Sequence, residues 1–416
     1  MVRRGRSSAR ACASGLSDLR RTGGAERKLL VIFAGDHGSA RAKGVEQLLR
    51  QYDEQGFFDK VILISPYLRR DARTSLDERH ELYEFGLGWA RFAGRVLAPL
   101  HVLRVILACR RLVRRERISV IRATEPTLCG FIAWATARLT GVRYVVSLHA
   151  DYDKLFTLDG ARGAPTLLGS RALIEPFERL ALRGASRVMP IRDSLVPYAL
   201  KRGVAADKVR VIPHGIDLTP FTRPPTVDIR RMLDVPADKA IVAFAGRLSP
   251  ENYVADMLDA SRLLAARRDD FVVVLAGGGV LERDVAARLE QDPALRHVVR
   301  AIGFVSQDIV RALYGTAVVS LCLMGGFSLI QACAAGRPVI AYDVDWHHEL
   351  VVNGKTGRLI REHDVGAVVD AVGAFLDDRA EASRMGAEAK ALAFVRHDIR
   401  TASELRRRWY AEILAG

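Results

Sequence analysis

The chain has 416 residues, of which 49% are hydrophobic and 27% are charged. This composition excludes an intrinsically disordered chain, and the length fits two α/β domains. The formal net charge of +15 leaves three kinds of partner open: a nucleic acid, an anionic membrane surface or a phosphorylated substrate. Nucleic acid is the weakest of these, because the sequence has no recognition-helix or zinc-finger pattern.

The cysteines indicate a reducing compartment, the cytosol. They are odd in number, scattered and never in a CxxC pair, which argues against a disulfide framework and a zinc site: Cys12, Cys109, Cys129, Cys322 and Cys333. Pro99 and Arg104 interrupt the longest apolar run, so no membrane span is expected. Residues 1–25 are rich in arginine without an apolar core. They predict a disordered basic tail, or an over-long start assignment, and not a secretory signal.

The N-terminal half alternates short apolar strands with helical segments. The first strand, 28–33, leads through a turn at Gly35 into a helix ending near Leu48, which is the first unit of a doubly wound sheet. Further strands are predicted at 61–65, 120–123, 144–148, 188–190 and 209–212. Because helices fill the gaps, the sheet is predicted to be parallel.

A second series of strands follows after a join near 217–227. Its members are fully apolar and each is followed by a helical period: 240–245, 271–276, 298–302, 318–322 and 339–342. The pattern again predicts a Rossmann-like parallel sheet, so the chain is expected to be an α/β protein with two domains.

A glycine loop within the second series predicts a phosphate-binding site. Gly325 and Gly326 allow close approach of the backbone to a ligand, and Ser328 opens a helix whose positive end suits a phosphate. The helix is predicted to stop at Gly336, because Pro338 cannot continue it. A glycine loop followed by a helix is, on its own, only a moderately specific sign of a phosphate-binding site.

Three further motifs occur in order with this loop, at 211–217 (VIPHGID), 244–251 (FAGRLSPE) and 301–305 (AIGFV). Together the four segments resemble the retaining GT-B glycosyltransferases of the glycosyltransferase family 4 type. In that family the first motif is the interdomain hinge, the second carries the basic group for the donor pyrophosphate, and the third receives the nucleobase. The resemblance covers roughly residues 28 to 414.

The resemblance implies the GT-B fold, with two Rossmann-like, doubly wound parallel-sheet domains facing a cleft. Residues 26–222 would form the acceptor-side domain, 223–394 the nucleotide-sugar-binding domain, and 395–416 a helix packing back on the first domain. The implied activity moves a sugar from a UDP- or GDP-sugar to a hydroxyl of a glycan or lipid-linked acceptor with retention, in cell-surface polysaccharide or glycolipid biosynthesis. No cofactor or metal is expected, and the implied location is cytoplasmic, with contact to the inner face of the membrane left open.

Arg247 ends a strand and is expected to project at the carboxyl edge of the sheet, where α/β proteins bind ligands. Its guanidinium can hold diphosphate oxygens, although a surface arginine paired with Glu251 is the alternative. The resemblance implies catalytic roles for Arg247 and His149. It also implies a donor-binding set: Gly35, Gly246, Arg247, Asn252, Phe304, Val305, Gly326, Phe327, Ser328, Leu329 and Gln331.

Three positions depart from the family pattern. Asn252 stands where a lysine is usual, Gln331 replaces the second of two glutamates, and the first falls at Leu323. An amide in place of the ribose-binding carboxylate is expected to weaken donor binding by about 1–2 kcal/mol.

His149 follows a predicted strand, and the resemblance places it near the sugar; a loop histidine capping the next helix is the alternative. Asp151-Tyr-Asp153 spells the DxD pattern of metal-dependent transferases, but Asp343-Val-Asp345 shows that the spacing recurs by chance. The acceptor is expected near Gly35, Glu125 and His149.

The segment 101–115 is an amphipathic basic helix that could lie on an anionic bilayer, although covering the first sheet is the simpler role. Two rival functions also stay open: a catalytically weak or non-catalytic nucleotide-sugar-binding protein of the same fold, and a UDP-sugar epimerase. Measuring the turnover of the donor distinguishes these two functions from that of a transferase.

Overall fold

The computed structural model describes residues 26–35, 37–42, 49–53, 56–68, 70–86, 98–154 and 170–415, so the predicted basic tail lies outside it. The chain forms two compact units. The smaller unit comprises the residues up to 124 together with 129–144, and the larger unit comprises 125–128 together with 145–416.

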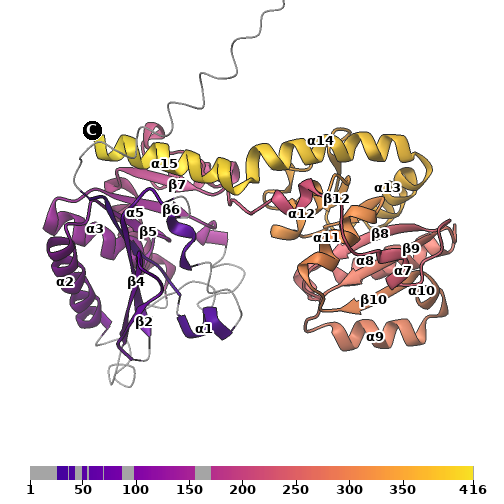
Figure 1. Cartoon of the computed structure of the whole chain (residues 1–416), viewed down its shortest axis with the longest axis horizontal. Helices are drawn as coiled ribbons and strands as arrows, with labels where there is room; N and C mark the ends of the chain where they lie inside the picture. Colours follow the sequence, from indigo (N-terminus) through magenta and orange to yellow (C-terminus); the bar gives the residue numbers. More distant parts are fainter. Residues whose placement is uncertain are drawn as a thin grey trace, which may run out of the picture. The chain divides into compact units, whose positions relative to one another are not determined.

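The first sheet has seven strands in the order β3-β4-β2-β1-β5-β6-β7 (Figure 1). The strands are β1 (Lys28–Ile32), β2 (Lys60–Leu68), β3 (Ala72–Ser75), β4 (His80–Gly86), β5 (Val120–Ala123), β6 (Tyr144–Leu148) and β7 (Arg187–Pro190). The pairs β1–β2, β1–β5, β2–β4 and β6–β7 are parallel, as expected. The edge strand β3 is antiparallel to β4, a hairpin that the sequence analysis did not predict.

Helices accompany this sheet: α1 (His37–Ala42), α2 (Ala98–Glu116), α3 (Leu128–Thr140), α5 (Arg171–Gly184) and α6 (Val196–Lys201). The apolar face of α2 is buried through Val105, Ile106, Cys109, Leu112 and Val113. This burial supports the simpler of its two predicted roles, a helix that covers a core. Among the described residues, no helix combines the length and apolar character needed to cross a bilayer.

The second sheet has six strands in the order β10-β9-β8-β11-β12-β13, and every neighbouring pair is parallel. The strands are β8 (Ala240–Ala245), β9 (Phe271–Ala276), β10 (Val299–Gly303), β11 (Val319–Leu321), β12 (Val339–Tyr342) and β13 (Gly357–Ile360). The helices are α7 (Ile229–Met232), α8 (Val254–Ala265), α9 (Glu282–Gln291), α10 (Pro293–Val298), α11 (Gln307–Thr316), α12 (Phe327–Ala334), α13 (Val365–Asp377) and α14 (Arg379–His397).

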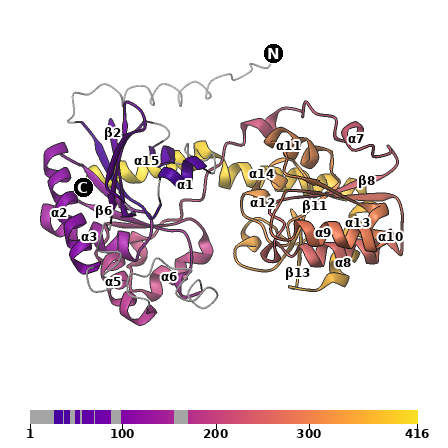
Figure 2. The same ribbon diagram turned by 90° about the horizontal axis from the view of Figure 1, so that it is seen from below.

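Alternate residues along the strands of the second sheet belong to two hydrophobic cores, one on each face of the sheet. Val242 and Phe244 of β8 belong to the core shared with α8 and α13. Ile241 and Ala243 belong to the core shared with α11 and α12. Side chains of a strand point alternately to opposite faces, so a strand buried on both faces reads as one continuous apolar run. Helices on both faces make this a doubly wound sheet (Figure 2).

The predicted hinge motif meets the junction of the last two helices. Ile216 donates its backbone N–H to the carbonyl of His397 at 2.9 Å and accepts from the N–H of Ile399 at 2.9 Å. A Cβ on Gly215 would lie 2.8 Å from the Cα of Ile399, so this approach requires glycine. The helix that follows, α15 (Ile399–Ala415), places the Trp409 ring 5.7 Å from the guanidinium carbon of Arg187 in β7.

Several predicted boundaries differ from the structure. The strand expected at 209–212 is absent, and only a single bridge joins Val209 to Val188. The short strand β13 was not predicted, and α12 begins at Phe327, one residue before Ser328, which was expected to open the helix. The helix expected to reach Leu48 is described only as far as Ala42, and residues 43–48 lie outside the described residues.

Candidate functional site

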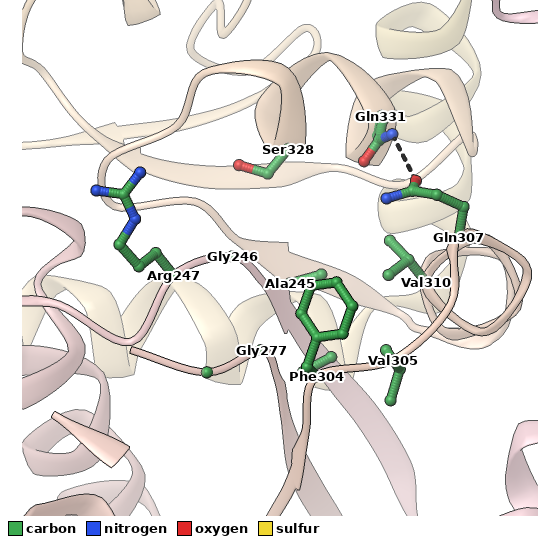
Figure 3. A pocket seen from close by; sticks show the side chains of 12 residues that line it. Ala245, Gly246, Arg247, Gly277, Phe304, Val305, Gln307, Val310, Ser328 and Gln331 are labelled. Atoms are coloured by element: carbon green, nitrogen blue, oxygen red, sulfur yellow. Dashed lines mark hydrogen bonds between the residues drawn. The ribbon is translucent and has the colours of Figure 1, made fainter. Parts of the chain in front are cut away.

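A pocket of about 340 Å³ opens at the carboxyl edge of the second sheet (Figure 3). Its walls come from the ends of β8, β9 and β10 and from the first turns of α11 and α12. The lining residues are Ala245, Gly246, Arg247, Ala276, Gly277, Gly278, Phe304, Val305, Gln307, Val310, Ser328 and Gln331. We call it the Arg247 pocket. Open α/β sheets bind ligands at this edge.

Glycines at the strand ends let the backbone itself form the pocket floor. Gly277 has φ +143°, and a Cβ there would lie 1.8 Å from the carbonyl oxygen of Gly246, so no other residue fits. The N–H of Gly277 donates to the carbonyl of Gly303 at 2.7 Å, which joins the loops after β9 and β10. Gly277 and Gly278 were not predicted from the sequence, although they follow an apolar strand as Gly246 does.

Arg247 lies exposed at the rim of the pocket. Within the described residues its guanidinium forms no ion pair, so the alternative of a paired surface arginine is not what the structure shows. The pKa of Glu251 is lowered, first by a hydrogen bond with Ser249 and only last by the charge of Arg247. The cation is therefore available to an anionic ligand.

The glycine loop before α12 is held by a histidine that the sequence analysis did not propose for the site. His347 is fully buried, and its Nε2 accepts from the N–H of Gly325 at 3.1 Å. Its Nδ1 lies 2.8 Å from the carbonyl of Tyr342, so Nδ1 carries the proton and the ring is neutral. Burial lowers the pKa of His347, in keeping with this neutral state. The loop is thereby fixed where α12 starts.

Gln331 and Gln307 form a hydrogen-bonded pair on the pocket wall. The Nε2 of Gln331 donates to the Oε1 of Gln307 at 3.1 Å, and the Gln331 carbonyl oxygen points away from that contact (Figure 3). Gln331 was predicted from the sequence and Gln307 was not. Nothing in the motif pattern marks Gln307, because the pairing depends on how α11 packs beside α12.

Six predicted donor-site residues meet in the Arg247 pocket: Gly246, Arg247, Phe304, Val305, Ser328 and Gln331. The ring of Phe304 is 91% exposed, which is unusual for a large apolar side chain away from a partner. Ser328, in the first turn of α12, also lines the Arg247 pocket (Figure 3).

Other predicted donor-site residues lie elsewhere. The amide of Asn252 donates to the carbonyl of Arg247 at 2.7 Å, so it ties the turn together instead of lining the pocket. The side chain of Leu329 is buried in the core, which leaves only its backbone for a ligand. Gly326 is exposed at the start of α12, and Phe327 is half exposed.

His149 lies at the end of β6 in a row of rings within the larger unit. Its centroid is 5.3 Å from that of His214, which in turn is 5.7 Å from that of Phe327. The helical turn after His149 is capped by Asp151, whose Oδ1 accepts from the N–H of Asp153 at 2.9 Å. His149 is therefore not the capping residue considered as its alternative role.

Two further predicted residues lie in loops that follow strands of the first sheet, Gly35 after β1 and Glu125 after β5. The carbonyl of Gly35, in the smaller unit, accepts from the hydroxyl of Ser65. The carboxylate of Glu125 is buried and accepts from the backbone N–H of Thr127 at 2.7 Å.

Three of the four carboxylates in the two DxD patterns, those of Asp151, Asp153 and Asp345, are engaged with protein groups. Partial burial alone would raise the pKa of Asp153, but hydrogen bonds and charge from Arg171 and Arg202 hold it below its usual value. Asp345 pairs with Arg192. In the described part of the chain, no group of three or more histidine, cysteine or carboxylate side chains is arranged to hold a metal ion.

Comparisons with known proteins place this chain in a family. The model for glycosyl transferases group 1 matches residues 227–392, and that for the glycosyl transferase 4-like domain matches 41–215. D-inositol 3-phosphate glycosyltransferase 2 of Catenulispora acidiphila is 30% identical over 320 residues, covering 70% of this chain and 72% of that enzyme.

Solved structures share this fold. Sucrose-phosphate synthase of Thermosynechococcus elongatus superposes with a TM-score of 0.67 at 18% identity, covering 94% of this chain and all of that one. HepE of Anabaena in complex with UDP gives 0.67 at 18% identity, covering 93% and 100%. The fold and family expected from the four motifs are thus confirmed, and the chain belongs to the group 1 glycosyltransferases of family 4, with the GT-B fold.

Proposed function

We propose that this chain transfers a sugar from a nucleotide-sugar donor to an acceptor hydroxyl, with retention of the anomeric configuration. The observation that carries the proposal is the chemistry of the Arg247 pocket. Its described lining residues include one exposed cation, backbone-rich glycine turns and two amides, but no carboxylate. A pocket with this lining suits a dianionic diphosphate attached to a neutral ribose and base.

The diphosphate is held by charge and by backbone dipoles. Arg247 offers a planar fork of donors, and the first turn of α12 beside Ser328 offers free N–H groups at its positive end. These donors also stabilise the negative charge that grows on the leaving nucleotide as the glycosidic bond breaks. Metal is not required in this scheme, because Arg247 and α12 meet the phosphate charge.

The base and ribose occupy the other wall of the pocket. Phe304 and Val305 follow β10 and would receive the base, while Gln331 faces the ribose hydroxyls. The UDP complex of HepE, a protein of the same fold, supports a uridine nucleotide as the first candidate. GDP stays the second candidate.

Retention is assigned to front-side attack. The bond between the sugar C1 and the donor phosphate oxygen breaks while the acceptor oxygen bonds to C1 on the same face. The departing phosphate oxygen takes the acceptor proton, so no protein nucleophile is needed. His149 is proposed to hydrogen-bond the sugar, and Arg247 to neutralise the leaving diphosphate.

The acceptor is proposed to be a hydroxyl of a glycan or lipid-linked molecule, near Glu125 and His149 of the larger unit. A relative named for D-inositol 3-phosphate makes a polyol phosphate a further acceptor worth screening. Contact with an anionic membrane would use the outer face of α2, where Leu100 and Leu103 are 63% and 50% exposed.

A non-catalytic nucleotide-sugar binder is the second candidate. Leu323, at the position of the first family glutamate, is fully buried in a hydrophobic core, and Asn252 lies outside the pocket lining. Both features remove polar groups from the donor site and favour weak turnover.

Donor turnover decides between these functions. UDP and GDP are first screened for thermal stabilisation of the full chain, and the matching nucleotide-sugars are then incubated with a panel of acceptors. A transferase releases nucleotide only with an acceptor, and its activity should survive excess EDTA. An isomerised sugar nucleotide would indicate an epimerase, and binding without turnover would indicate the binder.

A further inference from the structure

The amide of Gln331 has a fixed orientation, and Gln307 is the residue that fixes it. An unpaired glutamine can present either its NH₂ group or its carbonyl to a ligand. Here the NH₂ group donates to the Oε1 of Gln307 at 3.1 Å, which turns the carbonyl oxygen away from Gln307 (Figure 3). The carbonyl oxygen of Gln331 is therefore presented to the pocket as a hydrogen-bond acceptor.

A hydrogen-bond acceptor at this position can bind a vicinal diol. The carbonyl oxygen has two lone pairs and can accept one hydrogen bond from each of two neighbouring hydroxyls. Donation of the NH₂ group to Gln307 also polarises the amide, which strengthens the carbonyl as an acceptor. An oriented amide can thus reproduce part of what a carboxylate does, without its charge.

Within the described part of the chain, the contact with Gln331 is the only side-chain hydrogen bond of Gln307. It is the exposed first residue of α11, and the packing of α11 against α12 is made by buried residues such as Val310, Leu313, Ile330 and Cys333. Replacing Gln307 is therefore expected to leave the fold intact.

We infer that Gln307 is a positioning residue that orients the Gln331 amide so that its carbonyl reads the ribose diol of the donor nucleotide. The inference rests on the proposed function, because it assumes a ribonucleotide in the Arg247 pocket. It assigns the discrimination of ribonucleotides from 2′-deoxyribonucleotides to the Gln307–Gln331 pair.

The test is calorimetric titration of the full chain with UDP and 2′-deoxy-UDP, and with GDP and 2′-deoxy-GDP in parallel. The unmodified chain should prefer the ribonucleotide by about fivefold, the scale of one hydrogen bond. Gln307→Ala should weaken ribonucleotide binding about fivefold more than deoxynucleotide binding, because the deoxynucleotide has only its 3′-hydroxyl contact to lose, so the preference disappears. Gln291→Ala, at an exposed glutamine of α9, is the matched control and should keep the preference.

Two more variants separate orientation from mere contact. Gln307→Glu still accepts from the Gln331 amide and should keep the preference, because the ratio of the two affinities cancels any charge repulsion. Gln331→Glu should restore the preference in the Gln307→Ala background, since a carboxylate has no donor face to misdirect.

The inference is overturned if Gln307→Ala keeps the wild-type preference or weakens both nucleotides equally. An unmodified chain that binds ribo- and deoxyribonucleotides equally would also overturn it, while leaving the proposed function standing. Failure of the unmodified chain to bind any of the four nucleotides would instead overturn the proposed function, and this inference with it.

Discussion

Two groups of charged side chains in the larger unit differ in how they are paired. In the first, which we call the Glu178 cluster, the fully buried Glu178 contacts Arg171 at 2.5 Å and Arg202 at 3.4 Å, and Arg202 also reaches Asp153 at 2.5 Å. In the second, the Arg247 pocket, one exposed arginine faces glycines and amides. A closed set of ion pairs indicates a structural role, and an unpaired cation in a pocket indicates a ligand.

Mutations in the Glu178 cluster should have the largest effect, and this effect should be on the free energy of unfolding and not on nucleotide binding. Arg202→Ala removes a guanidinium that is only 2% exposed and leaves Glu178 with a less compensated buried charge. We expect the free energy of unfolding to fall by about 3–5 kcal/mol, as for other buried pairs broken on one side. Urea unfolding measures this. A loss below about 1 kcal/mol would mean that solvent already screens the cluster.

The Arg247 pocket should show the opposite pattern. Arg247→Ala is expected to weaken UDP or GDP binding by about 1.5–3 kcal/mol, because a charge-assisted contact is lost, with no change in melting temperature. Arg283→Ala, at an exposed arginine of α9, serves as the matched control and should bind normally. Unchanged nucleotide affinity in folded Arg247→Ala would show that the donor site has been misplaced.

Acidification should destabilise the larger unit through its buried histidines. Burial lowers the pKa of His347 and of His397 from 6.5. Between the lowered values and 6.5 the unfolded chain binds more protons, so stability is complete above about pH 6.5 and is lost as the pH falls through this window. The slope is at most about 1.4 kcal/mol per pH unit for each histidine.

Urea midpoints at pH 7.5 and 5.5 check this expectation. His347→Gln keeps an acceptor for Gly325 but cannot be protonated, so its midpoint should fall less between the two pH values than that of the unmodified chain. A wild-type midpoint that does not fall, or an equal fall in the variant, would contradict the role given to His347.

Gln331→Glu is expected to have the smallest effect. A carboxylate accepts from both ribose hydroxyls, so donor binding should tighten by up to about tenfold. A new charge without a full set of partners would reduce this gain through desolvation. Equal affinities in wild type, Gln331→Glu and Gln331→Ala would mean that residue 331 does not touch the ribose.

Buried parallel strands were the easiest elements to predict from the sequence. The strands β8, β9 and β12 have the expected limits, because each is a short apolar run buried on both faces. The strand β4 was missed because only alternate residues are buried and because glutamates interrupt its apolar pattern, Glu81 on one face and Glu84 on the other. At 209–212 an apolar run exists, but it is followed by Pro213 and forms only one bridge.

The site was predictable where it depends on local motifs and not where it depends on packing. The residues around Gly246, Phe304 and Ser328 were expected, because each follows a strand at the same edge of the sheet. Gln307 and His347 act on residues 24 and 22 positions away, so only the fold brings these pairs together. The same motif reasoning placed Asn252 in the site, but its amide turns back to the Arg247 carbonyl.

Hydrogen–deuterium exchange of the full chain with and without UDP or GDP tests the location of the donor site most directly. We predict slower exchange on nucleotide binding in 245–248, 276–278, 303–307 and 323–331, the segments that form the Arg247 pocket and its glycine loop. Exchange in 171–184 and 196–202, which hold the Glu178 cluster, should be unchanged. Protection of the Glu178 cluster, or nucleotide binding without protection of 323–331, would contradict the assignment.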